Sequence, residues 1–302
     1  MKPRLESTEL KVYRSVNARM ELEGKEKLHY SFLEKWLEGE LKFDSLLERL
    51  EGEYLILKDI LLDYQGNLFQ IDTLIISKNT IHMFEVKNYE GDYYVDADNW
   101  FSTSGTEIKN PLSQLKRTES LFRRYLQFFR SPLKLECYLV FVNPEFTLLQ
   151  APLNELIILP TQLNRFLRNL EFPRAPLTNT PINLAKKILA DPIVDSPYKR
   201  LPTYEYKQLE KGIWCCRCRS LRTHVEGRKL LICESCGVQE ELESAILRSV
   251  EEFQVLFLNR KITTNAVQDW CLVVESRKGI RRVLDKHYTK IGSKKHTYFI
   301  AK

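Results

Sequence analysis

Residues 81–87, with the sequence IHMFEVK, place a carboxylate and an ammonium group two positions apart in an apolar run. Side chains alternate across a strand, so we expect Glu85 and Lys87 to project from the same face. Asp72 lies in the preceding apolar run, and pairing of the two runs as a hairpin would bring it close to Glu85. Two such carboxylates can hold Mg²⁺, and a nearby lysine can orient or deprotonate a water that attacks a phosphodiester. The alternative is a surface ion pair on an edge strand, because Glu-x-Lys triplets are common.

A second group of chemically competent residues is a cysteine cluster. Five of the seven cysteines fall within 22 positions: Cys215, Cys216, Cys218, Cys233 and Cys236. Two C-x₂-C pairs separated by fourteen residues can arrange four thiolates tetrahedrally around Zn²⁺, as in a zinc ribbon. Cys216 could replace Cys215 as the first ligand, although regular C-x₂-C spacing favours Cys215. Four thiolates leave no open coordination position, so we expect a structural zinc site formed by Cys215, Cys218, Cys233 and Cys236.

The charge of the 302-residue chain is unevenly distributed. Residues 276–302 carry nine Lys and Arg against Asp285 alone, a net charge of +8, whereas the whole chain carries +6. The remaining residues therefore sum to about −2. A hydrophobic content of 43% and a charged content of 28% favour a folded globular protein over a disordered one. We find no apolar membrane span and no secretory signal, so we expect a cytoplasmic protein, in which clustered cysteines indicate metal binding.

The elements around the first group read as an α/β domain. We expect a helix over residues 10–38, with Leu22, Leu28, Phe32 and Trp36 as its apolar stripe. Strands are expected at 54–62, 68–77, 81–88, 93–101, 135–142 and 156–159, with a helix opening at Asn110-Pro111. Six prolines between positions 173 and 202 indicate a linker with one short helix at 184–189.

The carboxyl-terminal residues read as three helices and a hairpin. We expect helices over 242–258, from a Thr263 or Thr264 cap to 270, and from a Ser276 cap to 288. In the third, Ile280, Val283, Leu284 and Tyr288 form the inner face, and a basic hairpin follows at 291–299. This order resembles a winged helix-turn-helix, which would present these basic residues to nucleic acid: Arg277, Lys278, Arg281, Arg282, Lys286, Lys294 and Lys295. The alternative is a small protein-contact domain with a solvated basic face.

Several motifs in order resemble those of the NERD (nuclease-related) domain, a branch of the PD-(D/E)xK restriction-endonuclease-like superfamily. They are Glu23-Gly24-Lys25-Glu26, Gln70-Ile71-Asp72, the segment 84–91 (FEVKNYEG), Trp100 and the segment 110–114 (NPLSQ). The resemblance spans about residues 18–130. It implies that Asp72 and Glu85 are metal ligands and that Lys87 activates the water. It further implies that Glu26 supports the metal or the lysine, and that Gln114 orients the site or contacts phosphate.

We therefore expect a restriction-endonuclease-like core, a mixed sheet flanked by helices, over residues 10–171. A proline-rich linker (172–204), a zinc ribbon (205–240) and a winged-helix-like domain (241–302) would follow. The expected function is a nuclease that hydrolyses nucleic-acid phosphodiester bonds with Mg²⁺ or Mn²⁺, carries structural Zn²⁺ and binds nucleic acid, with DNA favoured. The competing hypothesis is a non-catalytic DNA-binding or protein-interaction protein on a nuclease-like scaffold.

Overall fold

The computed structural model describes residues 2, 4–153, 156–170, 172–190, 193 and 198–302, without the side chain of Lys295. The chain forms two compact units. The first comprises residues 1–6 and 32–197, and the second comprises residues 7–31 and 198–302. Each unit is therefore discontinuous in sequence. Within the described part of the chain, every helix is too short or too polar to cross a membrane.

The first unit is built on a mixed five-stranded sheet with the order β1-β2-β3-β7-β9. Strands β1, β2 and β3 form an antiparallel meander, and β3, β7 and β9 run parallel. The turn after β1 uses two residues with positive φ, Gln65 (+53°) and Gly66 (+78°), as a tight hairpin requires. The strands are β1 (Leu55–Tyr64), β2 (Asn67–Ile76), β3 (Thr80–Lys87), β7 (Lys134–Phe141) and β9 (Ile157–Ile158).

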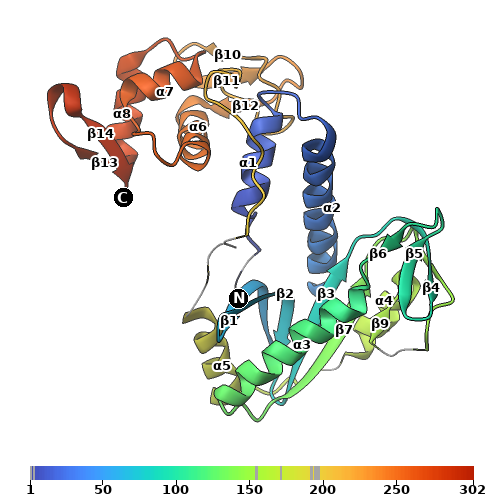
Figure 1. Ribbon diagram of the computed structural model, residues 1–302. Coiled ribbons are helices and arrows are strands. Elements are labelled where there is room, and N and C mark those ends of the chain that lie inside the picture. Colours follow the sequence, from blue (N-terminus) through green and yellow to red (C-terminus); the bar gives the residue numbers. More distant parts are fainter. Residues whose placement is uncertain (1, 3, 154–155, 171, 191–192, 194–197) are drawn as a thin grey trace. The chain divides into compact units, whose positions relative to one another are not determined.

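Helices cover both faces of this sheet. On one face, α3 (Pro111–Phe128) and α5 (Asn179–Ala190) enclose an apolar core that includes Leu115 and Phe122. Figure 1 shows α3 lying across the strands. On the other face, the last turns of α2 (Gly24–Leu47) and α4 (Pro160–Asn169) pack over a second core, which includes Phe84 and Val86. The chain therefore has the expected mixed sheet flanked by helices.

A smaller four-stranded sheet, β6-β5-β4-β8, follows β3. The single strand expected over residues 93–101 is wrong, because that segment is a hairpin. Ala97 and Asp98 both have positive φ, at 44° and 75°, and reverse the chain in two residues. Such a turn needs two left-handed residues, which Asp adopts more readily than most. The strands are β4 (Gly91–Asp96), β5 (Asn99–Ser102), β6 (Glu107–Ile108) and β8 (Phe146–Leu149).

The second unit combines a small sheet, β10-β11-β12, with helices and a terminal hairpin. The expected caps are present: the Thr263 hydroxyl accepts the Ala266 N–H, and the Ser276 hydroxyl accepts the Gly279 N–H. The four residues expected on the inner face of the last helix are all buried. The hairpin strands lie slightly outside the expected 291–299, because a one-turn helix, η1 (Lys294–His296), occupies the tip. The elements are β10 (Thr223–Glu226), β11 (Leu230–Cys233), β12 (Gln239–Glu241), α6 (Leu242–Leu256), α7 (Thr264–Cys271), α8 (Arg277–His287), β13 (Tyr288–Ile291) and β14 (Tyr298–Ala301).

The continuous amino-terminal helix expected over residues 10–38 is wrong. Helix α1 (Thr8–Asn17) ends well before α2 begins at Gly24. Between them, the buried Arg19 guanidinium donates to the carbonyl oxygens of Glu210 (2.6 Å) and Gly212 (2.9 Å) and pairs with Glu252 (2.6 Å). These bonds hold the backbone around Arg19 in a non-helical conformation and attach it to the rest of the second unit.

The apolar stripe expected on that helix does not form a core either. Leu28, Phe32 and Trp36 of α2 are 55%, 58% and 44% exposed, whereas Leu22, which precedes the helix, is buried.

Candidate active site and metal centre

Strand β3 and helix α3 together position a compact polar group in the first unit. Lys87 Nζ lies 2.7 Å from Glu85 Oε1, and both side chains project from the face covered by α3. Gln114, in the first turns of α3, donates through Nε2 to the same Glu85 oxygen (2.5 Å). It also accepts a hydrogen bond from Lys87 Nζ through Oε1 (3.1 Å). The three side chains therefore form a closed triangle, which fixes the orientation of each.

Asp72 joins this group from β2 because the strand is distorted there. Ile71 and Leu74 both belong to the core beneath α3, so the two-residue alternation of β2 slips at Asp72 and Thr73. The Asp72 side chain instead accepts the Val86 backbone N–H through Oδ2, at 2.8 Å. Arg4 holds the distorted backbone by donating to the Asp72 carbonyl oxygen (3.1 Å). This arrangement brings Asp72 beside the Glu85–Lys87 segment, as the hairpin predicts.

Glu40 of α2 is an acidic neighbour of this site that sequence reasoning missed. It is 7% exposed, and its Oε1 lies 2.9 Å from Arg4 Nη1. The preceding Gly39 permits this approach, since a Cβ at that position would lie 2.4 Å from Asn88 Cβ, just after β3. The sequence signal that could have found Glu40 is the Glu38-Gly39-Glu40 segment, which resembles Glu23-Gly24-Lys25-Glu26.

Burial and mutual repulsion dominate the electrostatics of these carboxylates. Asp72 is 3% exposed, and its pKa is raised well above the ordinary value, first by burial and then by the charges of Glu85 and Glu40. Burial likewise raises the pKa of Glu40 to about 7, although Arg4 opposes the shift. Burial lowers the pKa of Lys87, but the attraction of Glu85 and Asp72 outweighs it, so the net shift is upward. Excess negative charge out of water is what a bound cation would relieve.

The donor set fits a hard divalent cation. Asp72 and Glu85 offer buried carboxylate oxygens, and Mg²⁺ is commonly held by one or two carboxylates while keeping several waters. Among the residues that the structure describes, no third carboxylate oxygen comes close enough to complete a cluster of three ligands here. Two carboxylates and solvent are therefore the coordination that this site supports.

Glu26 lies elsewhere. It is in the first turn of α2, in the part of that helix that groups with the second unit. Its Oε1 accepts the backbone N–H of Thr203, at 3.0 Å. The structure thus brings Asp72, Glu85, Lys87 and Gln114 together and gives Glu26 a different partner, so a role for Glu26 at the site stays a prediction.

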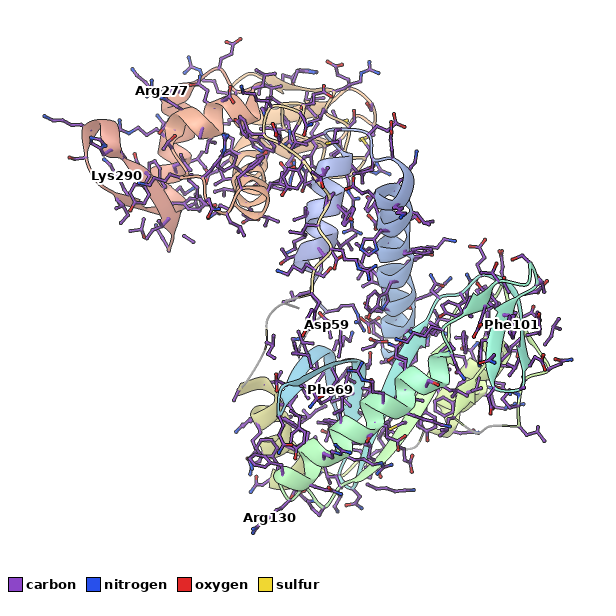
Figure 2. The ribbon with its side chains drawn as sticks, viewed as in Figure 1. Asp59, Phe69, Phe101, Arg130, Arg277 and Lys290 are labelled. Carbon is purple, nitrogen blue, oxygen red and sulfur yellow. The ribbon has the colours of Figure 1, made fainter. Side chains whose placement is uncertain are left out.

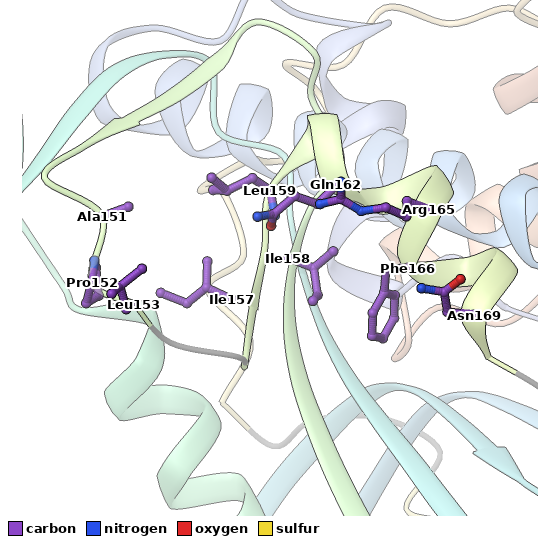
Figure 3. Close-up of a pocket in the computed structure, with 10 residues that line it drawn as sticks. All are labelled: Ala151, Pro152, Leu153, Ile157, Ile158, Leu159, Gln162, Arg165, Phe166 and Asn169. Carbon is purple, nitrogen blue, oxygen red and sulfur yellow. The ribbon is translucent and has the colours of Figure 1, made fainter.

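A cavity of about 240 Å³ opens beside the acidic site. Residues from α2, β2 and the start of α3 line it, including Trp36, Gln70, Asp72, Lys109, Gln114 and Arg117. A larger cavity of about 640 Å³ lies between β9 and α4, with Ile158 and Phe166 on its wall (Figure 3). It shares no lining residue with the smaller one and offers no carboxylate. The smaller cavity is therefore the one connected to the candidate chemistry.

The second unit holds the thiol cluster. The sulfur atoms of Cys215, Cys218, Cys233 and Cys236 all lie within 4.8 Å of one another, and none forms a disulfide. The Cys215–Cys236 and Cys218–Cys233 Sγ distances are 3.6 and 3.5 Å. Tetrahedral Zn–S bonds of about 2.3 Å place the sulfurs about 3.8 Å apart. The four thiols therefore fit Zn²⁺, and the cluster is consistent with the expected zinc ribbon.

The two C-x₂-C loops have the same backbone geometry. The first residue of each pair accepts an N–H from the residue four positions later, Arg219 or Gly237, at 2.9 Å. Each of these later residues is left-handed, with φ of +59° and +70°. Cys216 is exposed and lies outside the cluster, so the cluster contains Cys215 as the first cysteine of its pair.

A basic surface follows the thiol cluster in sequence. The side chains of Arg277, Lys278, Arg281, Arg282, Lys286 and Lys294 are all exposed, and that of Lys295 lies outside the described part. Two of them are partly neutralised: Arg281 lies 3.5 Å from Asp285, and Lys286 lies 2.6 Å from Glu243. Lys290 in β13 is exposed as well, and Figure 2 labels it and Arg277. The surface keeps a net positive charge along α8.

Comparison with known families matches residues 35–142 to the nuclease-related domain (NERD). The matched range includes Glu40, Asp72, Glu85, Lys87 and Gln114 but begins after Glu26. No curated protein and no solved structure matches the chain.

Proposed function

We propose that this protein is a metal-dependent nuclease of the PD-(D/E)xK type, which hydrolyses phosphodiester bonds in nucleic acid. The observation that carries the proposal is the placement of Lys87 Nζ 2.7 Å from Glu85, with Asp72 bound to the backbone between them. A buried acidic pair with an adjacent lysine, inside a nuclease-related domain, has the residue types that phosphodiester hydrolysis requires.

In this proposal Asp72 and Glu85 hold Mg²⁺ or Mn²⁺. The bound cation would supply Lewis-acid stabilisation of the negative charge that develops on the phosphate oxygens. Lys87 orients the attacking water, and its ammonium group adds positive charge beside the phosphate. Gln114 fixes the positions of the Glu85 carboxylate and the Lys87 ammonium relative to each other through its two hydrogen bonds.

We assign to Glu40 the supporting acidic role that the resemblance gave to Glu26. Glu40 is buried, and its charge raises the pKa of Asp72, so Glu40 lies close enough to influence that carboxylate electrostatically. Arg4 joins them, because its guanidinium contacts Glu40 and the Asp72 backbone. Glu26, with its bond to Thr203, would then serve the second unit alone.

The carboxyl-terminal residues would provide affinity for the substrate. The domain order proposed is a nuclease-like domain (expected at 10–171), a linker (172–204), a zinc ribbon (205–240) and a winged-helix-like domain (241–302). The bounds of the first two shift, because residues 10–31 group with the second unit and α5 packs in the core of the first. Helix α8 is 11 residues long, carries exposed Arg and Lys and is followed by a basic hairpin, which suits DNA backbone contacts. A cytoplasmic location would keep the zinc-binding thiols reduced.

The test is cleavage of labelled single-stranded and duplex DNA and RNA with Mg²⁺ or Mn²⁺. The wild type should cleave at least one of these, Lys87→Ala should not, and Lys78→Ala in the turn after β2 should behave as wild type. If the purified wild type binds DNA but cleaves none of the substrates with either metal, the non-catalytic DNA-binding hypothesis replaces this proposal.

A further inference from the structure

The cavity beside Asp72 contains three residues that the proposed chemistry does not use. Trp36 of α2, Lys109 just before α3 and Arg117 of α3 line it together with Asp72 and Gln114. Trp36 is 44% exposed, and neither Lys109 nor Arg117 forms an ion pair with any residue that the structure describes. An aromatic face and two uncommitted cations around one cavity are the elements of a nucleotide site.

We propose that this cavity binds one unpaired nucleotide of the substrate strand, with its base against Trp36 and its phosphate between Lys109 and Arg117. The inference rests on the proposed function and adds to it a preference for single-stranded or frayed ends over intact duplex. Its basis is the composition of the cavity wall rather than the charge of the carboxyl-terminal residues.

The size and position of the cavity favour an unpaired base. A volume of about 240 Å³ corresponds to roughly eight waters, which is room enough for one planar base. A base inside a duplex is stacked on its neighbours, so it must leave the stack before it can lie against an indole ring. Single strands meet this condition without the unpairing cost, and stacking on an aromatic side chain tolerates any base.

The two cations are placed to bring the strand to the acidic site. Arg117 follows Gln114 by three residues on α3, so the two side chains share a helix face. Gln114 is bonded to Glu85 and Lys87. A phosphate held by Arg117 and Lys109 would therefore place the adjoining phosphodiester next to Asp72 and Glu85, where hydrolysis is proposed.

The experiment follows the fluorescence of Trp36 during titration of the full chain with a labelled single-stranded oligonucleotide, in EDTA. The chain has four tryptophans, of which Trp100 and Trp270 are fully buried, so Trp36→Phe identifies the signal of Trp36. We expect quenching in the wild type and its loss in Trp36→Phe, with affinity retained because phenylalanine also stacks. Trp36→Ala should weaken single-strand binding by about 5- to 100-fold.

Matched variants separate this site from general charge or surface effects. Phe32→Ala removes an exposed aromatic ring one turn away that does not line the cavity, and it should bind as wild type. Lys109→Ala with Arg117→Ala should flatten the slope of log K against log salt by about 0.7 for each phosphate that is no longer neutralised. Arg124→Ala, an exposed arginine further along α3 outside the cavity, should leave that slope unchanged.

Three outcomes would overturn the inference: no quenching by single strands, equal effects of Trp36→Ala and Phe32→Ala, or equal quenching by intact duplex. Failure of the proposed function looks different. Quenching that depends on Trp36, without cleavage under any metal condition, keeps the nucleotide site and removes only the hydrolysis.

Discussion

The two candidate metal sites place opposite demands on the chain. In the thiol cluster, four cysteines come from two loops with the same hydrogen-bond pattern, and no Asp, Glu or His among the described residues joins them. In the acidic site, Asp72, Glu85 and Glu40 come from β2, β3 and α2, and Arg4 and Lys87 already neutralise part of their charge. A four-thiolate zinc site would depend on its ion for folding, whereas the acidic site keeps its shape through salt bridges and hydrogen bonds.

That difference suggests a division of roles. A site whose ligands are held by other protein groups can exchange its ion and admit a substrate, because losing the ion does not unfold it. A four-thiolate site has no open position and derives its folding energy from the metal. We therefore expect metal removal to affect the two units in different ways.

The largest expected effect is loss of the zinc ribbon in Cys233→Ser. The variant should lose about one Zn²⁺ per chain and the local structure of the ribbon, because structural zinc contributes about 10 kcal/mol or more to folding. Zinc content by elemental analysis and thermal unfolding measure both. Cys216→Ser changes the exposed neighbouring thiol and should keep its zinc; loss of zinc from Cys216→Ser, with zinc kept in Cys233→Ser, would contradict the ligand assignment.

The next effect tests the acidic site without unfolding it. Lys87→Ala, Asp72→Ala and Glu85→Ala should each lower metal-dependent cleavage by about 10²- to 10⁴-fold, since each removes a group that positions the water or the cation. Thermal unfolding and zinc content should show that the variants remain folded. Unchanged cleavage rates in all three purified variants would refute the site.

The sequence predicted the thiol cluster more completely than the acidic site, because its ligands are local. The Cys215–Cys218 and Cys233–Cys236 spacings constrain the loop geometry by themselves. In the acidic site, Glu85 and Lys87 share a strand, so the alternation of side chains predicted that they project from one face. The approach of Asp72 was predicted from the pairing of its strand with theirs in a hairpin. For Glu40 the sequence offers only the Gly39-Glu40 pair, because its place at the site depends on how closely α2 packs against the end of β3.

Helices were predicted well where a local pattern, such as an apolar face or a capping residue, determines them. The inner face of α8 and the cap at Asn110, whose side chain accepts the Leu112 N–H, depend on local rules and were found. The break after α1 could not be found, because it depends on Arg19 reaching Glu252 across more than two hundred residues. Three members of the predicted apolar stripe, Leu28, Phe32 and Trp36, are exposed, since periodicity cannot distinguish a buried apolar stripe from one that faces solvent.

A paired substitution would sharpen the assignment of the supporting carboxylate. Glu40→Gln should lower cleavage by about 10- to 100-fold, as expected for a residue that acts through a metal ligand. Glu26→Gln, on the same helix but bonded to Thr203, should leave cleavage unchanged. Metal titration of the cleavage rate should also shift to higher Mg²⁺ for Glu40→Gln. The reverse pattern would return the role to Glu26.

A smaller effect concerns the close approach that brings Glu40 to the site. Gly39→Ala adds a Cβ that would lie 2.4 Å from Asn88 Cβ, so α2 or the end of β3 must shift. We expect a loss of about 1–3 kcal/mol in the free energy of unfolding, measured by denaturant titration, together with reduced cleavage. Gly279→Ala, in α8, meets only the Ser276 side chain and should change stability by less than about 1 kcal/mol. Equal stability of both variants would show that Gly39 has no packing role.

The smallest effect separates substrate affinity from chemistry. Arg281→Ala with Arg282→Ala should weaken duplex DNA binding and flatten its salt dependence by about one unit for each phosphate left without its arginine, because fewer counterions are released. Cleavage at saturating substrate should stay the same. Arg281 lies 3.5 Å from Asp285, so its share should be smaller than that of Arg282.

The control for that pair is Lys186→Ala with Lys187→Ala in α5, which removes the same charge from the first unit. Point variants are the right form of this test, since a chain ending before residue 198 would leave the buried Arg19 without Glu210, Gly212 and Glu252. If the α5 pair flattens the salt slope as much as the α8 pair does, the effect is one of net charge. The basic helix would then be a solvated or protein-contacting face, and the first unit would have to bind any substrate unaided.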